Sequence, residues 1–364
     1  MIIYADTDVC QYHLDQTGQE FTRDFEFFVQ SPGSKSAVFH VPFPWKGGYG
    51  SEFQGKLNRI IDDCDHILIL SSELHNRIYE FIKENDHPKI SYFICGFLNR
   101  RPKHSHVYRW MDWFMTTLKF YKNVPTFLNK LTPYSVKPKA FDVLLGQPRS
   151  HRDIVYNYMK PHEDRVVLTY MRNFMQGLYD HDFNAIAIQD RPSNEYTWDL
   201  DGIAVPKNPV NFTIESVELH GQQVSISQIV PISIYNETAY SVVTETNFMN
   251  SYTFYTEKIV KPILAERLFV AFGGQHYLRN LHNLGFRTFG NIIDESYDEE
   301  PDMAKRYAMI YDQMLYLFDQ PQEEILARVR PITEYNKRHM LATDWYGYFS
   351  RELQAVLLDH KLAH

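Results

Sequence analysis

Cysteine is scarce in this sequence: only Cys10, Cys64 and Cys95 occur among 364 residues. Their spacing fits no zinc-binding motif, and three cysteines cannot all pair within one chain. A disulfide-rich secreted domain is therefore disfavoured, and we expect a reducing, cytoplasmic environment. In that environment the sequons at Asn211 and Asn236 carry no meaning.

The sequence also lacks an apolar run long enough to cross a membrane, so no membrane span is expected. Its first residues, MIIYADTD, have no basic region ahead of their short apolar run, which argues against a signal peptide. Hydrophobic residues make up 44% of the chain, as in globular rather than disordered proteins. The length is sufficient for two domains, each with its own core.

Several catalytic motifs are absent. The chain has no P-loop, no Gly-x-Ser-x-Gly turn and no G-x-G-x-x-G fingerprint, because the glycines within 47–50 have a different spacing. Kinases, serine hydrolases and typical dehydrogenases are therefore disfavoured. His104 and His106 have no partner ligands nearby, and we expect the acidic run 294–300 to cap a helix that continues to about Phe318. No metal site is expected.

Strand and helix patterns alternate in two blocks. The first block predicts strands at 1–4, 36–41, 67–70 and 90–95, with helices starting near Ser51 and spanning 73–83. The second block predicts strands at 140–145, 165–170 and 185–188, a strand ending at Glu245, and a strand at 268–272. Alternation around His220-Gly221-Gln222, within 210–228, predicts a β-hairpin insertion. The order indicates an α/β protein with two Rossmann-like domains.

The domain boundaries follow from these blocks. Residues 1–122 are predicted to form an N-terminal domain and residues 140–343 a C-terminal domain. The segment 123–139 contains three prolines and few periodic signals, so we predict a linker there. Residues 344–364 include an amphipathic stretch that predicts a C-terminal helix, capped by Thr343 or Asp344.

Charged residues follow two predicted strands of the second block. Lys258 lies in the first turn of the helix after Glu245, where a cation opposes the helix dipole and calls for an anion. A ligand diphosphate would supply that anion, because phosphates bind at strand ends and helix N-termini in parallel sheets. Glu257 can accept hydrogen bonds from a ribose, and Arg152 can reach the same phosphates. Any one of Glu257, Lys258 and Arg152 alone is explained as a surface charge in an ion pair. All three beside predicted strand ends favour a site for a phosphorylated ligand.

Two further features leave alternatives open. Gly273 and Gly274 either admit a ligand close to the backbone or simply turn the chain. Between residues 99 and 139, nine basic residues stand against the single acid Asp112, a net charge of +8 within a chain of −8. This stretch either attracts a polyanion or forms a solvated surface and a linker. Its candidate acceptor-binding residues are Arg100, Arg101, Lys103 and Arg109.

The segment AYSVVTETNFMNSYTFYTEKIVKPILAERLFVAFGG resembles the nucleotide-binding core of family-10 glycosyltransferases, the α1,3-fucosyltransferase group. In that family a strand ending in Phe-Glu-Asn-Ser precedes a Tyr-Val-Thr-Glu-Lys motif. Glu245 is similar to the first glutamate, and Thr256-Glu257-Lys258 match the end of the second motif. Thr246 replaces the motif asparagine, with Asn247 next to it. Phe254 replaces the motif tyrosine.

The resemblance implies a GT-B fold, with two Rossmann-like domains facing across a cleft, an N-terminal acceptor domain and a C-terminal donor domain. It also implies that the Glu-Lys pair binds donor ribose and diphosphate, and that Arg152 binds phosphate. The candidate donor-binding residues are Arg152, Glu245, Asn247, Tyr255, Thr256, Glu257, Lys258, Gly273 and Gly274.

The family likeness further implies an inverting, metal-independent transfer from a nucleoside-diphosphate sugar. An N-terminal carboxylate would act as the base that deprotonates the acceptor hydroxyl. Asp8 is favoured, with Asp6, Glu52 and Glu73 as alternatives at predicted strand ends or the glycine-rich turn.

The acceptor remains open between two classes. The segment FGGQHYLRNLHNLGFRTFGNIIDESYD looks like glycosyltransferase-like proteins of phages, and with the basic stretch it suggests hydroxymethylated duplex DNA in a host cytoplasm. The alternative acceptor is a glycan or lipopolysaccharide. A non-catalytic module that binds sugar nucleotides is a third hypothesis, kept open by the altered motif positions.

Overall fold

The computed structural model describes residues 36–41, 54–55, 57–58, 61–62, 64–71, 76–146, 149–170, 199–200, 203–204, 216–246, 248–349 and 351. These residues divide into two compact units. The first contains the described residues up to Thr116, together with Ser251–Phe254 and those from Asp344 onward. The second contains the described residues of Thr117–Asn250 and of Tyr255–Thr343. Along the described part of the chain, no helix is long and apolar enough to cross a membrane.

The first unit contains a parallel sheet in the order β1-β2-β3-β5. Its strands are β1 (Ser36–Val41), β2 (His66–Ser71), β3 (Ile90–Cys95) and β5 (His106–Trp110). Helix α4 (Asn76–Glu84) connects β2 to β3. The predicted strands at 36–41, 67–70 and 90–95 are confirmed. In β3 every residue except Ser91 is buried, as suits a strand inside a parallel sheet.

Two distant segments also join the first unit. Strand β4 (Phe97–Leu98) pairs antiparallel with β13 (Tyr252–Thr253). After the second unit the chain turns into a helix over residues 345–349, and the Asp344 carboxylate accepts a hydrogen bond from the Gly347 N–H at 2.9 Å. The prediction of a helix cap at this point is therefore confirmed for Asp344.

The second unit is built on a parallel sheet in the order β14-β12-β6-β7. The strands are β6 (Lys139–Leu145), β7 (Val166–Tyr170), β12 (Thr238–Thr244) and β14 (Phe269–Phe272). From β6 the chain first builds outward to β7, then returns to the opposite side for β12 and β14. The direction of winding therefore reverses between β6 and β12, and such a switch point is where open α/β sheets bind ligands.

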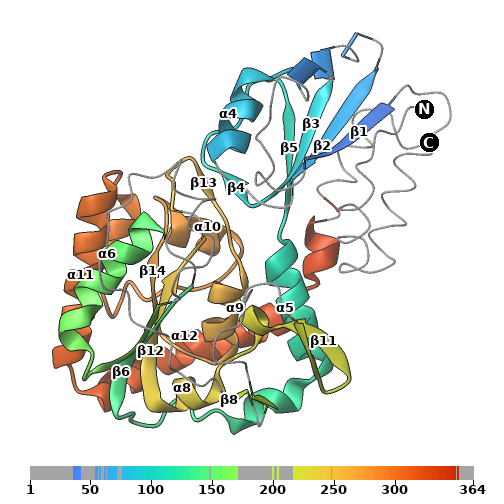
Figure 1. Cartoon of the computed structure of the whole chain (residues 1–364). Coiled ribbons are helices and arrows are strands. Elements are labelled where there is room, and N and C mark those ends of the chain that lie inside the picture. Colours follow the sequence, from blue (N-terminus) through green and yellow to red (C-terminus); the bar gives the residue numbers. More distant parts are fainter. Residues whose placement is uncertain are drawn as a thin grey trace. The chain divides into compact units, whose positions relative to one another are not determined.

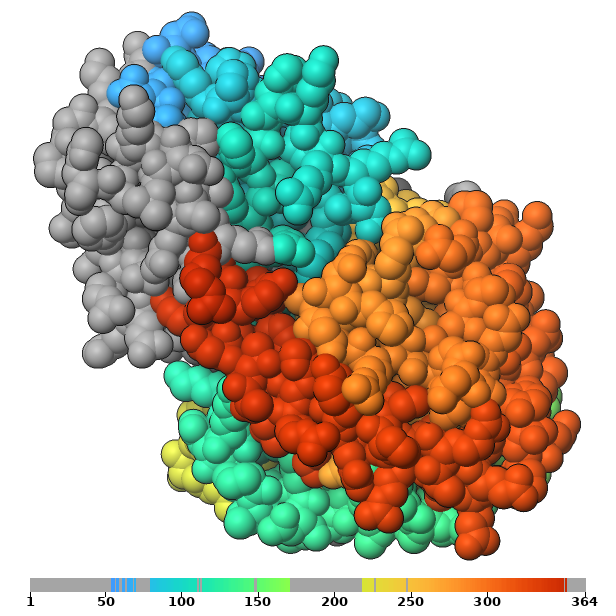
Figure 2. All heavy atoms as spheres, turned by 180° about the vertical axis from the view of Figure 1, so that it is seen from behind, coloured from blue at the N-terminus to red at the C-terminus, as the bar shows by residue number. Residues whose placement is uncertain are grey.

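Helices cover both faces of this sheet. Figure 1 places α6 (Ser150–Met159) and α11 (Met303–Asp319) on one side, and α9 (Glu257–Leu264) and α12 (Gln322–Ala342) on the other. Right-handed crossovers running in opposite directions along a sheet produce this two-sided cover. Figure 2 shows α12, in orange-red, along the surface of the second unit. The α/β class with parallel sheets is thus confirmed.

Shorter elements complete the second unit. They are the 3-10 helices at Lys160–His162, Ile226–Gln228 and Ser296–Glu299, the strands β8 (Asp199–Leu200) and β9 (Ile203–Ala204), and the helices α8 (Ile232–Glu237) and α10 (Tyr277–Asn283). Helix α5 (Asp112–Asn123) crosses the boundary at Thr116.

The predicted hairpin insertion is confirmed by β10 (Ser216–Leu219) and β11 (Gln222–Ser225), which pair antiparallel. Its two turn residues, His220 and Gly221, have φ values of 52° and 74°. Positive φ at both positions is typical of the primed turns that match the twist of a hairpin.

The segment 123–139 differs from the predicted linker. It lies within the second unit and begins with a 3-10 helix over Pro125–Lys130, in which Phe127 and Leu128 are buried. Proline pre-orders the first turn of such a helix, so Pro125 here starts structure instead of interrupting it.

Candidate functional site

The candidate site begins at the N-terminus of α9. Thr256 caps this helix: its hydroxyl oxygen accepts a hydrogen bond from the Lys258 N–H at 3.3 Å. The same hydroxyl donates to the Glu245 carboxylate at 2.8 Å. Threonine is a favoured N-cap because its oxygen satisfies an otherwise unpaired helix N–H. The cap therefore ties the start of α9 to the end of β12.

Glu245 is fully buried just after β12, and protein groups surround its carboxylate. Its oxygens accept hydrogen bonds from the Thr256 N–H at 3.3 Å, the Thr256 hydroxyl and the Tyr277 hydroxyl at 2.9 Å. Burial raises the pKa of this carboxyl. Glu245 therefore holds β12, α9 and α10 together, and its geometry is that of a positioning residue.

Tyr255 is likewise turned into the protein. It is fully buried, its hydroxyl donates to the Tyr277 carbonyl at 2.5 Å, and the two rings lie edge to face. Its position supports the turn into α9 rather than an exposed ligand contact.

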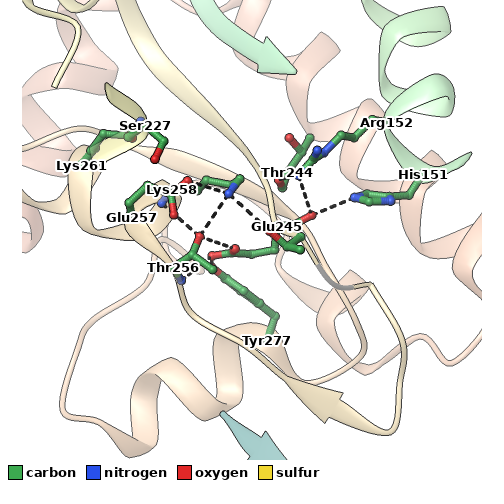
Figure 3. A network of polar contacts seen from close by, with 11 residues as sticks. His151, Arg152, Ser227, Thr244, Glu245, Thr256, Glu257, Lys258, Lys261 and Tyr277 are labelled. Carbon is green, nitrogen blue, oxygen red and sulfur yellow. Dashed lines mark hydrogen bonds and ion pairs between the residues drawn. The ribbon is translucent and has the colours of Figure 1, made fainter. Parts of the chain in front are cut away.

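Glu257 and Lys258 form an ion pair at the start of α9, with 2.6 Å between Lys258 Nζ and Glu257 Oε1 (Figure 3). Burial alone would raise the pKa of Glu257, but the charges of Lys258 and Lys261 hold it below its ordinary value. The Lys258 ammonium also lies 3.4 Å from the Thr246 hydroxyl. The side chain of Lys258 keeps 20% of its surface exposed, so an anion can reach it.

Arg152 approaches the same strand end from α6. Its Nη2 lies 3.4 Å from the Thr244 carbonyl and 3.5 Å from the Glu245 carbonyl (Figure 3). Burial and the neighbouring charge of Arg149 lower its pKa to about 10. Arg152 and Lys258 thus contact three successive residues, 244–246, beside the switch point of the sheet.

His151 contributes a second contact from α6 to this strand end. Its Nε2 lies 2.8 Å from the Glu245 carbonyl, and its ring lies 4.4 Å from the Phe248 ring. Burial and the adjacent charge of Arg152 hold the pKa of His151 well below its ordinary value, so the ring is neutral and Nε2–H donates.

The two glycines have different surroundings. A Cβ on Gly274 would lie 2.2 Å from the Met249 carbonyl oxygen, so the approach of two backbone segments requires glycine there. A Cβ on Gly273 would lie 3.0 Å from the Tyr277 ring, and the Gly273 carbonyl accepts a hydrogen bond from Arg306 Nε at 3.2 Å. Both positions are therefore explained by packing against the protein itself.

Sequence reasoning missed several residues of this region: Arg149, His151, Lys261, Arg306 and Tyr307. Of these, Lys261 had a local signal, because it lies one helical turn after Glu257. Its ammonium donates to the Ser227 carbonyl at 2.7 Å, and burial lowers its pKa to about 8. Arg306 and Tyr307 follow far along the chain and had no such signal.

The candidate bases Asp6, Asp8, Glu52 and Glu73 lie outside the described residues, as does Asn247. The predicted strands at 1–4 and 185–188 and the cap at Ser51 lie outside them as well.

The basic stretch 99–139 is divided between the two units. In the first unit Arg100, Arg101 and Lys103 are exposed, and the backbone N–H groups of Lys103, His104 and Ser105 all donate to the Asp86 carboxylate, at 2.6 to 2.8 Å. Arg109 is half-buried, with its guanidinium 4.8 Å from the centre of the Phe97 ring.

In the second unit, Lys137 is buried, with its ammonium bound to the Thr132 hydroxyl and its N–H donating to Gln322. Lys139 lies 3.7 Å from Glu237 and donates to the Val166 carbonyl. Lys137 is therefore neither an exposed contact for a polyanion nor part of a solvated linker, because the segment packs into the second unit.

The acidic run 294–300 caps a different helix from the one predicted. Asp298 accepts hydrogen bonds from the N–H groups of Leu278 and Arg279 at the start of α10, whereas Asp302 caps α11. His276, Asp298 and Glu299 place three potential metal-ligand atoms within 4.8 Å of one another. Because Asp298 already serves as a helix cap, this cluster has a structural explanation.

Together these features define an α/β unit with a doubly wound sheet and a cationic strand end at its switch point. No family model, curated protein or solved structure matches the chain.

Proposed function

We propose that this protein is a glycosyltransferase that moves a sugar from a nucleoside-diphosphate sugar to an acceptor hydroxyl. The observation that carries the proposal is the convergence of Arg152 and Lys258 on the carboxyl end of β12. Phosphorylated ligands bind at this position in doubly wound sheets, and two cations from separate helices suit a diphosphate.

The residues divide the chemistry between them. Lys258 and Arg152 bind the diphosphate and stabilise the negative charge that it gains as the bond to the sugar breaks. Glu257, held ionised by its lysine neighbours, accepts hydrogen bonds from the ribose hydroxyls. Glu245 and Thr256 hold these groups in position.

The transfer is proposed to be inverting. A carboxylate removes the acceptor proton, the acceptor oxygen attacks the anomeric carbon, and the nucleoside diphosphate leaves from the opposite face. Asp8 is the first candidate for this base, followed by Asp6 and Glu52. We propose a GT-B arrangement of two Rossmann-like domains, in which the second unit binds the donor and the first binds the acceptor.

The test is nucleotide binding by calorimetry with a panel of GDP, UDP, dTDP, ADP and CDP. The substitutions Lys258→Ala and Glu257→Ala should each lower the affinity for the preferred nucleotide by about 10- to 100-fold, the value of a hydrogen bond to a charged group. Lys305→Ala is a matched control, because Lys305 is an exposed lysine in the first turn of α11.

Binding that survives both site substitutions would overturn the assignment of the donor site. Release of nucleoside diphosphate from the bound sugar nucleotide then separates an enzyme from a non-catalytic binding module. If the protein binds the sugar nucleotide but releases no nucleoside diphosphate with any acceptor tested, the non-catalytic binding module is favoured.

The acceptor is proposed separately as hydroxymethylated duplex DNA, on the basis of the exposed cations Arg100, Arg101 and Lys103 on one loop. We expect duplex binding that weakens steeply with salt and a shallower salt dependence after these three are changed to alanine. If duplex DNA does not bind at low salt, a glycan or lipopolysaccharide acceptor is favoured instead.

A further inference from the structure

Two neighbouring residues of α11, Arg306 and Tyr307, place buried hydrogen-bond donors beside the carboxyl ends of the strands in the second unit. Arg306 is 1% exposed; its Nε donates to the Gly273 carbonyl at 3.2 Å and its Nη1 to the Glu300 carbonyl at 2.7 Å. Within the described ranges no carboxylate lies within 4 Å of this guanidinium, and its Nη2 has no hydrogen-bond partner. The buried hydroxyl of Tyr307 also has no partner among the described residues.

Both residues lie at the strand ends that hold the candidate site. In the register of the sheet Thr244 is opposite Phe272, so Glu245 and Gly273 follow at the same edge. Arg152 contacts the carbonyl of Glu245, and Arg306 contacts that of Gly273. The Tyr307 ring stands perpendicular to Phe272 with 5.0 Å between ring centres, and the charges of Arg306 and Arg152 both act on its phenol.

An unpartnered donor in the protein interior is unfavourable, and a buried guanidinium without a carboxylate is more so. Carbonyl contacts give Arg306 a structural role in holding the loops around Gly273 and Glu300. They do not explain why Nη2 and the neighbouring Tyr307 phenol have no hydrogen-bond partner among the described residues. A ligand rich in acceptor oxygens would satisfy both groups at once.

We propose that Arg306 and Tyr307 complete the pyrophosphate site by donating hydrogen bonds from Nη2 and the phenol to phosphate oxygens. This inference rests on the proposed function and adds two binding residues to it. Neighbouring strands lie about 4.8 Å apart, so donors anchored at β12 and at β14 are better shared by two linked phosphates than by one. The site therefore selects a diphosphate over a monophosphate.

Tyr307→Phe is the decisive variant. Removing an unpartnered hydroxyl should leave the melting temperature of the free protein unchanged or slightly higher. The affinity for inorganic pyrophosphate, measured by calorimetry, should fall by about 3- to 10-fold, the value of one hydrogen bond. Tyr240→Phe is the matched control: Tyr240 is also buried, and its hydroxyl has no partner in the described part of the chain, but it lies near the amino end of β12. Removing the Tyr240 hydroxyl should leave the affinity for pyrophosphate unchanged.

Arg306→Gln extends the test to the charge. We expect the affinity for pyrophosphate to fall by about 10- to 100-fold, and the affinity for inorganic phosphate to fall less, so that the preference for pyrophosphate narrows. A purely structural Arg306 would lower the melting temperature but leave that preference unchanged.

The outcomes separate this inference from the proposal on which it rests. If wild-type protein binds pyrophosphate and a nucleoside diphosphate, but Tyr307→Phe binds pyrophosphate equally well, the inference is overturned and the donor site stands. If wild-type protein binds neither compound, both are overturned. A selective loss in Tyr307→Phe and Arg306→Gln, with Tyr240→Phe unchanged, supports the inference.

Discussion

The two ends of the sheet in the second unit bury arginines in contrasting ways. At the amino end, Arg267 sits in a complete shell of acceptors. Its guanidinium donates to the Asp142 carboxylate at 2.9 Å, to the hydroxyls of Ser241 and Thr238, and to the carbonyls of Tyr235, Thr238 and Tyr240. At the carboxyl end, Arg152 has long contacts to two carbonyls, and Arg306 keeps one nitrogen without a partner in the described region.

The surroundings of Arg267 suit an arginine that stabilises the fold, whereas those of Arg152 and Arg306 suit arginines that bind an anion. A buried cation with all donors satisfied and a paired carboxylate is stable without any ligand. The protein environment of Arg152 instead disfavours its charge, since burial and Arg149 lower its pKa. A ligand anion would offset the cost at the carboxyl end. The Arg306 Nη2, which has no partner among the described residues, and the lowered pKa of Arg152 therefore agree with the proposed ligand site there.

The largest expected effect compares Arg267→Met with Arg152→Met. Arg267→Met leaves Asp142 buried without its partner and should lower the free energy of unfolding by about 3–5 kcal/mol. Arg152→Met removes a cation that its surroundings disfavour and should change that free energy by less than about 1 kcal/mol, or raise it. Urea unfolding of both variants measures the difference.

The affinity for a nucleoside diphosphate should instead be reduced more by Arg152→Met than by Arg267→Met. Arg152→Met should lose nucleoside-diphosphate affinity, whereas Arg267→Met, where folded, should retain it. Equal destabilisation by the two variants would contradict the distinction between the ends of the sheet. The double variant Arg267→Met with Asp142→Leu provides a control, because removing both charges should recover part of the stability lost in the single variant.

The strands of the two parallel sheets, apart from β5, were predictable from local sequence, and much of the site was not. Unbroken apolar runs such as 67–70 and 268–272 suit strands buried on both faces, and Thr256 before Glu257 is a local helix-start signal. The Gly274 contact with Met249 and the placement of Arg306 depend on packing between segments far apart in the chain. Local patterns hold no information on such contacts.

The same limit applies to the roles of predicted residues. The strand-end position of Glu245 was visible in the sequence, but not the hydroxyl of Tyr277 that binds its carboxylate. Prolines in 123–139 predicted a linker because proline disrupts regular structure, yet Pro125 starts a 3-10 helix whose apolar residues pack into the second unit. Whether proline ends or begins an element depends on what its neighbours bury.

The smallest expected effect concerns Lys261, whose charge is felt at both ends of the sheet, by Glu257 and by Asp142. Its pKa of about 8 in the folded protein lies below the 10.5 of an unperturbed lysine. The unfolded chain therefore binds more protons between these values, so the contribution of Lys261 makes the protein more stable as pH rises through that window. Loss of the same charge weakens anion binding.

Raising the pH from 7 to 9 should therefore lower nucleoside-diphosphate affinity by about 3- to 10-fold while the Lys261 contribution to stability increases. Arg152, with its pKa of about 10, remains largely charged over this range. Lys261→Met should remove both pH trends, whereas Lys305→Met, at an exposed position on α11, should preserve them. Calorimetry and urea unfolding at pH 7 and pH 9 measure the two trends. If the affinity still falls with pH in Lys261→Met, another group is responsible for the titration. Lys261 would then have only its structural role, the hydrogen bond to the Ser227 carbonyl.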